Sequence, residues 1–187
     1  MSTSALPSLP QRITLAGGCF WCLDAAYRPL RGVLRVECGY SNGHAMHPSY
    51  REVCTGRTGH AEVIRLDFDP DVLPLSTVLE VFFAMHDPTT LNRQGNDVGP
   101  QYRSGIYTHD AEQLAAVRDF VQKLSAQKLF SDPILTEIEP ESNYSPAEAE
   151  HQDYFAHHPY QGYCAAVIAP KVDKLRKHYA TLLRAGA

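Results

Sequence analysis

A strand, a glycine turn and the start of a helix meet around Cys19. The apolar run of residues 13–16 precedes a Gly-Gly pair, and residues 20–27 continue with a helical pattern. Cys19 is therefore predicted at a helix N-terminus, where the positive end of the helix dipole favours a thiolate. Only the thiolate is nucleophilic, and Trp21, the one tryptophan of the chain, would place an apolar wall beside it. The segment indicates a thiol-based redox or transfer enzyme with an ionised Cys19.

The rest of the chain alternates strands and helices in an irregular order. Strands are predicted over residues 12–16, 33–39, 60–69, 103–108 and 133–139. Helices are predicted from Cys19, over residues 75–86, from Asp110, from Ser145 and over residues 170–184, with long loops over residues 41–59 and 87–101. This order favours an α+β fold, a single-domain sandwich of a mixed or antiparallel central sheet with flanking helices and a ferredoxin-like core. At 187 residues, we expect one catalytic domain over residues 12–187 after a flexible tail over residues 1–11.

Charge and cysteine content narrow the class of protein. A net charge of −4 gives no reason to expect nucleic acid or a membrane surface as a partner. No apolar run reaches the length that crosses a bilayer. Five cysteines in a chain without a secretory signal pattern predict reduced thiols rather than a disulfide scaffold. We therefore expect a cytoplasmic monomer.

The spacing of Cys19 and Cys22 places their side chains on one helix face, with Cα atoms about 5–6 Å apart and within reach of a disulfide. A redox pair, half of a zinc site and two inert buried thiols all fit this spacing. No second Cys-x-x-Cys pair supplies further zinc ligands, and the nine histidines include no zinc-hydrolase pair. The redox pair is favoured, with no metal and no cofactor expected.

Glu62 is the candidate acid. It shares one face of its predicted strand with Ile64, Leu66 and Phe68, which should point to the core. Burial disfavours a charged carboxylate and raises its pKa, so such a group can donate a proton near neutral pH. The alternative is a carboxylate at the mouth of the strand, solvated or paired with an arginine.

Several separated motifs resemble one family, the A-type peptide methionine sulfoxide reductases, over residues 13–177. The motifs are Gly18-Cys19-Phe20-Trp21, Gly39-Tyr40 through Pro48-Ser49-Tyr50, Thr58-Gly59-His60-Ala61-Glu62, Gln94-Gly95-Asn96-Asp97 through Gln101-Tyr102-Arg103-Ser104, His151-Gln152-Asp153-Tyr154 and Gly162-Tyr163-Cys164. Each motif alone is weak, and their order along the chain makes the resemblance specific. It implies reduction of methionine-(S)-sulfoxide, free or in proteins, with thioredoxin as the reductant.

The resemblance also implies roles for single residues. Cys19 would attack the sulfoxide sulfur, and Glu62 would protonate its oxygen. Tyr50 and Tyr102 would donate hydrogen bonds to that oxygen, and Asp97 would organise the site. A sulfenic acid on the attacking sulfur would condense with a second thiol to a disulfide. Without the resemblance, the sequence pattern around these residues predicts only two loop tyrosines and a turn aspartate.

The remaining roles concern the methyl pocket and the second thiol. Phe20 and Trp21 would form the pocket for the S-methyl group. Cys164 resembles the resolving cysteine, whereas Cys22 stands where many members have glycine. Both remain candidates, with Cys164 slightly favoured and a relay through both also open. Pro100 replaces a threonine of many relatives, which perturbs the turn before Tyr102.

Two other functions compete with the reductase. A disulfide oxidoreductase of the thioredoxin type would use the Cys19–Cys22 pair, but the long loops and Glu62 argue against it. A non-catalytic module that only binds oxidised methionine would show binding without product.

Overall fold

The structure is a computed structural model that describes residues 8–186. The strands are β1 (Gln11–Gly17), β2 (Val33–Ser41), β3 (Ala61–Phe68), β4 (Arg93–Gln94), β5 (Asp97–Val98), β6 (Ser104–Thr108), β7 (Glu137–Pro140) and β8 (Ser145–Pro146). The helices are α1 (Phe20–Tyr27), α2 (Tyr50–Cys54), α3 (Leu75–Met85), α4 (Ala111–Ala126), α5 (Tyr154–His157) and α6 (Ala169–His178). Short 3₁₀ turns are η1 (Pro100–Tyr102), η2 (Ala149–His151) and η4 (Ala180–Leu182), and η3 (Cys164–Ile168) is a π-helical turn.

Six strands form one mixed sheet in the order β7-β6-β1-β3-β2-β8, and β4 and β5 form a separate hairpin. Only the β6–β7 pair is parallel, and the other pairs of the sheet are antiparallel. The segment order β1-α1-β2-β3-α3-β6 with the strand order β6-β1-β3-β2 is that of a split β-α-β unit. The predicted α+β fold with a ferredoxin-like core is confirmed.

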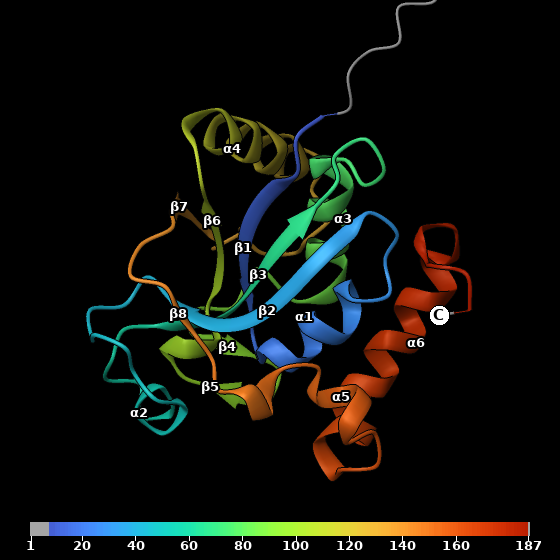
Figure 1. Cartoon of the computed structure of the whole chain (residues 1–187). Coiled ribbons are helices and arrows are strands. Elements are labelled where there is room, and N and C mark those ends of the chain that lie inside the picture. Colours follow the sequence, from blue (N-terminus) through green and yellow to red (C-terminus); the bar gives the residue numbers. More distant parts are fainter. Residues whose placement is uncertain (1–7, 187) are drawn as a thin grey trace, which may run out of the picture.

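One face of the sheet carries the hydrophobic core. Alternation along β1 and β3 sends Ile13, Leu15, Ile64 and Leu66 into one buried cluster, to which α1, α3, α4 and α6 contribute. In Figure 1, α1 lies against β2 and β3, with α6 beyond it. Tyr40 pairs with Glu62 in the β2–β3 register, and Glu62 accepts a hydrogen bond from the backbone N–H of Phe20, so this part of the sheet lies beside the start of α1.

Two predicted loops contain short elements. Residues 41–59 hold α2, because Ser49 and Glu52 form a reciprocal capping box at its start. Residues 87–101 hold the β4–β5 hairpin and η1. Local hydrogen bonds therefore order both segments, which the sequence pattern described only as polar and rich in turns.

The prediction of a helix from Ser145 is wrong. Ser145 and Pro146 form β8, which pairs with Tyr40 and Gly39 at the edge of the sheet. The carboxylate of Glu148 accepts hydrogen bonds from Tyr40 and from the backbone N–H of Tyr50 instead of capping a helix. Pairing with β2 thus prevails over a local capping signal.

Other boundaries shift by a few residues. The strand expected over residues 133–139 is limited to β7, and the last helix begins at Ala169 and ends at His178. Residues 1–7 of the predicted tail lie outside the described residues, as does residue 187. Ser8 hydrogen-bonds the carboxylate of Asp71, and Gln11 begins β1. Between residues 8 and 186, no helix combines the length and the apolar character needed to cross a bilayer.

Candidate active site

Cys19 is the N-cap residue of α1, as the strand–turn–helix pattern predicts. Gly18 has φ of +88°, and a Cβ added there would lie 2.6 Å from Gln94 Cγ. Glycine is therefore required for the chain to leave β1 and enter the helix at this angle. The backbone N–H of Cys22 donates to the Cys19 carbonyl at 3.1 Å, which closes the first turn.

The pKa values of the two thiols of this turn are shifted in opposite directions. All five cysteines are free. Burial and the hydrogen bond with Cys22 raise the pKa of Cys19 well above its usual value. The same hydrogen bond with Cys19, together with the charge of Lys171, lowers the pKa of Cys22 to about 7. The first thiolate of the pair therefore forms at Cys22.

Burial acts against the predicted thiolate at Cys19. The helix dipole contributes about 0.3–1 kcal/mol near a helix end, whereas desolvation of a buried charge shifts a pKa by up to about 3–5 units. The Cys19 side chain is only 8 % exposed, so desolvation prevails. The hydrogen bond between the two thiols thus favours a thiolate on Cys22 over one on Cys19.

Glu62 lies on β3 and is 1 % exposed, so the predicted burial is confirmed. Its carboxyl oxygen accepts a hydrogen bond from the backbone N–H of Phe20 at 3.1 Å, rather than pairing with an arginine. Burial raises the pKa of Glu62 to about 8, and the negative charges of Asp97 and Cys22 act in the same direction. A protonated carboxyl group thus contacts the backbone of Phe20, the residue that follows Cys19.

Tyr50 and Tyr102 reach the same region from α2 and η1. Burial and the negative charge of Glu62 raise the pKa of both phenols, so both hydroxyls keep their protons. The backbone N–H of Tyr50 donates to Glu148 at 2.7 Å, which fixes the start of α2. The structure therefore gathers two hydroxyl donors around the acid.

Phe20 and Trp21 form an aromatic wall beside the thiols. The Phe20 ring is fully buried and lies 6.2 Å from Trp21 and 6.3 Å from Tyr50, measured between ring centroids. Trp21 stacks on Tyr154 at 3.8 Å with an interplanar angle of 7°. Such a wall suits an apolar methyl group.

Three further residues belong to the site, although no role was assigned to them from the sequence. His151 is 5 % exposed, lies 5.7 Å from the Trp21 ring, and within residues 8–186 neither of its ring nitrogens has a hydrogen-bond partner. Tyr154 covers Trp21, and Tyr163 donates a hydrogen bond to Asp97 at 2.6 Å. In the sequence, these three residues are marked only because they belong to motifs near the C-terminus. Hydrophobic periodicity does not show which distant residues contact Trp21.

Cys164 is the other candidate for the resolving thiol. It lies in η3 and is 0 % exposed. Burial raises its pKa, and the negative charge of Cys22 adds to this shift. Cys164 therefore lies near Cys22 but is closed to solvent while Tyr163, its neighbour, is bonded to Asp97.

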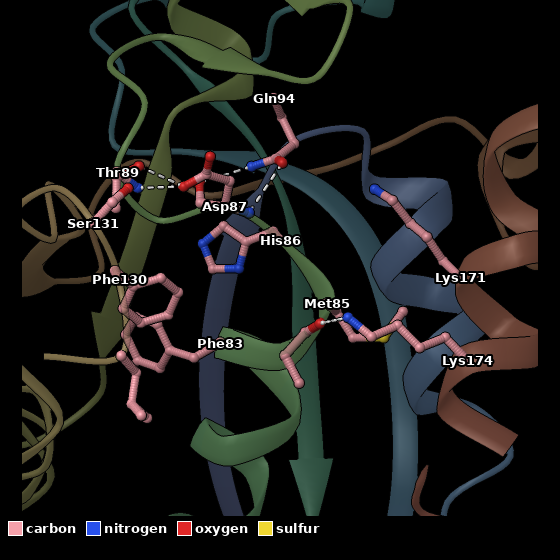
Figure 2. Close-up of a pocket in the computed structure, with 12 residues that line it drawn as sticks. Phe83, Met85, His86, Asp87, Thr89, Gln94, Phe130, Ser131, Lys171 and Lys174 are labelled. Carbon is pink, nitrogen blue, oxygen red and sulfur yellow. Dashed lines mark hydrogen bonds between the residues drawn. The ribbon is translucent and has the colours of Figure 1, made fainter. Parts of the chain in front are cut away.

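A cavity of about 600 Å³ lies on the other side of the glycine turn (Figure 2). His86 and Gln94 line it, and their side chains also pack against Gly17 and Gly18, respectively. Figure 2 shows Lys171 and Lys174 facing it from α6. None of the cysteines lines this cavity, so it is not the place of the thiol chemistry.

Between residues 8 and 186, no group of three His, Cys, Asp or Glu side chains is placed to hold a metal ion. The polar groups around Cys19 are instead an acid, hydroxyl donors and a second thiol. This arrangement can bind a polar oxygen, protonate it and attack the atom that carries it.

Known proteins match the chain over most of its length. A family model described as peptide methionine sulfoxide reductase matches residues 11–183. Peptide methionine sulfoxide reductase MsrA of Polynucleobacter asymbioticus is 52% identical over 178 residues, which cover 95% of this chain and 93% of that protein.

Solved structures of methionine sulfoxide reductases are also similar to this chain. The reduced form of Mxr1 from Saccharomyces cerevisiae has a TM-score of 0.79 at 34% identity and covers 90% of this chain and 97% of that one. A complex of Mxr1 with Trx2 has a TM-score of 0.55 at 26% identity, with 82% and 92% covered.

Proposed function

We propose that Cys19 and Glu62 are the catalytic residues of this chain, which belongs to the peptide methionine sulfoxide reductase family. The chain reduces methionine sulfoxide to methionine, with Cys19 as the proposed nucleophile and Glu62 as the proposed proton donor. The observation that carries this assignment is the burial of Glu62, 1 % exposed and hydrogen-bonded to Phe20, beside the thiol turn. An acid with a pKa of about 8 stays protonated at neutral pH until an oxygen needs the proton.

The aromatic wall and the hydroxyl donors match the two ends of a sulfoxide. The S-methyl group packs on Phe20 and Trp21, because it is the apolar end of the group. The oxygen carries the negative end of the S–O dipole and accepts hydrogen bonds from Tyr50 and Tyr102. We assign the S epimer as the substrate, free or within a protein, as the A-type resemblance implies.

The first chemical step joins Cys19 to the sulfoxide. Glu62 gives its proton to the sulfoxide oxygen, and the thiol proton of Cys19 passes to the Cys22 thiolate along their hydrogen bond. The Cys19 sulfur attacks the sulfoxide sulfur and forms an S–S bond, with the protonated oxygen still bound to the methionine sulfur. This hydroxyl then moves to the Cys19 sulfur, as the methionine S–O bond and the new S–S bond break. Thiol and sulfoxide together give a sulfenic acid on Cys19 and methionine, so atoms and electrons balance.

The next steps return Cys19 to the thiol. Cys22 lies in the same helical turn, so its thiol condenses with the sulfenic acid, which forms the Cys19–Cys22 disulfide and releases water. Cys164, near Cys22, then attacks the Cys22 sulfur and frees Cys19. This order makes Cys22 the first resolving residue and Cys164 the second.

Thioredoxin is the proposed reductant of the final disulfide. The structural neighbour Mxr1 is solved in a complex with Trx2, which supports a dithiol protein in this role. Thioredoxin transfers electrons by thiol–disulfide exchange and leaves the enzyme with free thiols. We also propose that the enzyme acts as a monomer in the cytoplasm, where thiols stay reduced.

A single-turnover experiment tests the assignment. The reduced protein is mixed with excess methionine-(S)-sulfoxide and no reductant, and the methionine formed is counted with the remaining thiols. We expect about two methionines per chain if Cys164 takes over the disulfide and frees Cys19 for a second reaction. Cys164→Ser should give about one, and Cys19→Ser none.

The controls separate the steps. Cys54→Ser alters an exposed cysteine and should keep the wild-type stoichiometry. One methionine from both the wild type and Cys164→Ser would remove Cys164 from the sequence of steps. Binding of the sulfoxide without product would contradict the reductase function and favour a binding module.

A further inference from the structure

Four consecutive residues, His151 to Tyr154, connect the aromatic wall to the frame of the fold. His151 and Tyr154 both lie against Trp21, with the Tyr154 ring flat on the indole at 3.8 Å. The two residues between them point elsewhere. Gln152 accepts from the Cys38 N–H at 2.8 Å and donates to the Cys38 carbonyl at 3.0 Å, so its amide pairs with β2 as a strand residue would.

Asp153 supplies the second anchor of this segment. Its backbone is in the left-handed region, with φ of 53° and ψ of 37°, and it forms the N-cap of α5. This conformation turns the chain so that Tyr154 comes back over Trp21. The Asp153 carboxylate lies 3.3 Å from Nε of Arg28, which stands at the C-cap of α1.

Arg28 is itself held rigidly. Its guanidinium donates to both carboxylate oxygens of Asp24, at 3.0 and 2.7 Å, and to the Val36 carbonyl at 3.3 Å. Asp24 is 1 % exposed, so this carboxylate has little alternative partner in water. Only the planar fork of an arginine reaches two oxygens of one carboxylate and a second carboxylate at once.

We propose that Arg28 is a positioning residue for the methyl pocket: it ties Asp153 to the frame of α1 and β2 and thereby keeps Tyr154 stacked on Trp21. Arg28 itself touches no reacting atom. The proposal rests on the proposed function where it treats the Trp21 face as the site of the S-methyl group. Its structural part, the order of the Trp21–Tyr154 stack, holds independently of the reaction.

The single tryptophan allows a direct test. Arg28→Lys keeps the charge but loses the fork, and Asp153→Asn removes the carboxylate while asparagine tolerates the left-handed backbone. In both variants we expect the acrylamide quenching constant of Trp21 fluorescence to rise about twofold, as the stack opens. The KM for methionine-(S)-sulfoxide should rise roughly tenfold in Arg28→Lys, with kcat within about threefold of wild type.

The matched control is Arg12→Lys, because Arg12 also donates to both oxygens of a carboxylate, that of Asp67, but joins β1 to β3. It should change neither quenching nor KM. The double variant Arg28→Lys/Asp153→Asn should be no worse than Arg28→Lys, since both changes break the same contact.

Wild-type quenching and KM in folded Arg28→Lys and Asp153→Asn proteins would overturn the proposal. Additive effects in the double variant would do so as well. A wild-type protein that forms no methionine would instead contradict the proposed function, and the quenching results would still decide the role of Arg28.

Discussion

The backbone N–H of Phe20 donates a hydrogen bond of 3.1 Å to Glu62, which joins the start of α1 to β3, a central strand of the sheet. The bond places the acid next to the residue that follows Cys19. It also lowers the pKa of Glu62, but burial is the larger influence and raises that pKa to about 8. The acid is therefore protonated in the neutral enzyme, and this state sets the pH range in which the reaction can run.

The first prediction concerns the rate of the Glu62→Gln variant. Glutamine keeps an acceptor for the Phe20 N–H but donates no proton to the sulfoxide oxygen. We expect methionine formation in a single turnover to slow by about 10²–10⁴-fold, the usual effect of losing a positioned general acid. Rapid quenching of the reduced enzyme with excess sulfoxide measures this step without the recycling reaction.

The pH profile provides the control for this prediction. In the wild type, the rate should fall above about pH 8 as Glu62 loses its proton, and below about pH 7 as the Cys22 thiolate is protonated. Glu62→Gln should lose the alkaline limb and keep the acid limb. A rate within a few-fold of wild type, or an unchanged alkaline limb, would remove Glu62 from the acid role.

The second prediction concerns stability. The pKa of Glu62 is higher in the folded than in the unfolded chain, so its contribution is complete below about pH 4.5 and is lost as pH rises toward 8. The free energy of unfolding should fall by roughly 1.4 kcal/mol per pH unit on this account. Glu62→Gln removes the cost, so it should be more stable than wild type at pH 8 by about 2–4 kcal/mol, with little difference at pH 4.5.

Urea denaturation at the two pH values measures this difference. Glu80→Gln, on an exposed position of α3, is the matched control and should show no gain at pH 8. If Glu62→Gln has the same free energy of unfolding as wild type at pH 8, the ionised form of Glu62 does not destabilise the folded protein. The same residue would then be a weak candidate for a proton donor at neutral pH.

The sequence predicts the central part of the fold because its strands carry clear alternation. Ile64, Leu66 and Phe68 mark the buried face of β3, and Glu62 follows them onto that face. The short elements are not predicted where contact with a residue distant in the sequence determines the secondary structure. Ser145 and Pro146 carry a helix-start signal but pair with β2, and no local pattern contains that partner.

For the site, too, some features can be predicted from the sequence and others depend on distant contacts. The order of motifs identifies which residues meet, and the structure brings Cys19, Glu62, Tyr50 and Tyr102 together. The ionisation of the thiols was not predictable, because desolvation of Cys19 depends on the whole enclosure rather than on the helix end beneath it. The cover of Trp21 by Tyr154 was equally hidden, since it needs the turn at Asp153.

The third prediction concerns the access of Cys164. Its neighbour Tyr163 donates a hydrogen bond of 2.6 Å to Asp97, and the Cys164 side chain is buried. We expect this bond to hold the segment that buries the thiol. Tyr163→Phe removes a hydrogen bond to a charged group, so local opening should become easier and alkylation of Cys164 about tenfold faster. Peptide mass mapping after brief iodoacetamide treatment measures the rate at each cysteine.

Tyr160→Phe is the control for this experiment, because the Tyr160 side chain is 95 % exposed. It should leave the alkylation of Cys164 unchanged. Equal alkylation rates in wild type and Tyr163→Phe would show that the Asp97–Tyr163 bond does not restrict Cys164.

The last prediction concerns Lys171, whose positive charge lowers the pKa of Cys22. The groups with the largest influence on the pKa of Cys22 are Cys19, Lys171, Tyr163 and Asp97, and Lys171 is the cation among these four. Lys171→Met should raise the pKa of the Cys22 thiol, so the acid limb of the single-turnover pH profile should move upward by about half a unit to one unit. Lys171→Arg should restore the wild-type limb.

Lys174→Met is the matched control for Lys171. Lys174 lies on the same helix, and its ammonium donates to the Ala84 carbonyl at 3.4 Å. Its loss should not move the acid limb, whereas an equal shift in both variants would indicate only the general field of α6. An unmoved acid limb in Lys171→Met would mean that the hydrogen bond from Cys19 alone sets the ionisation of Cys22, and the proton transfer between the two thiols would then need no cation.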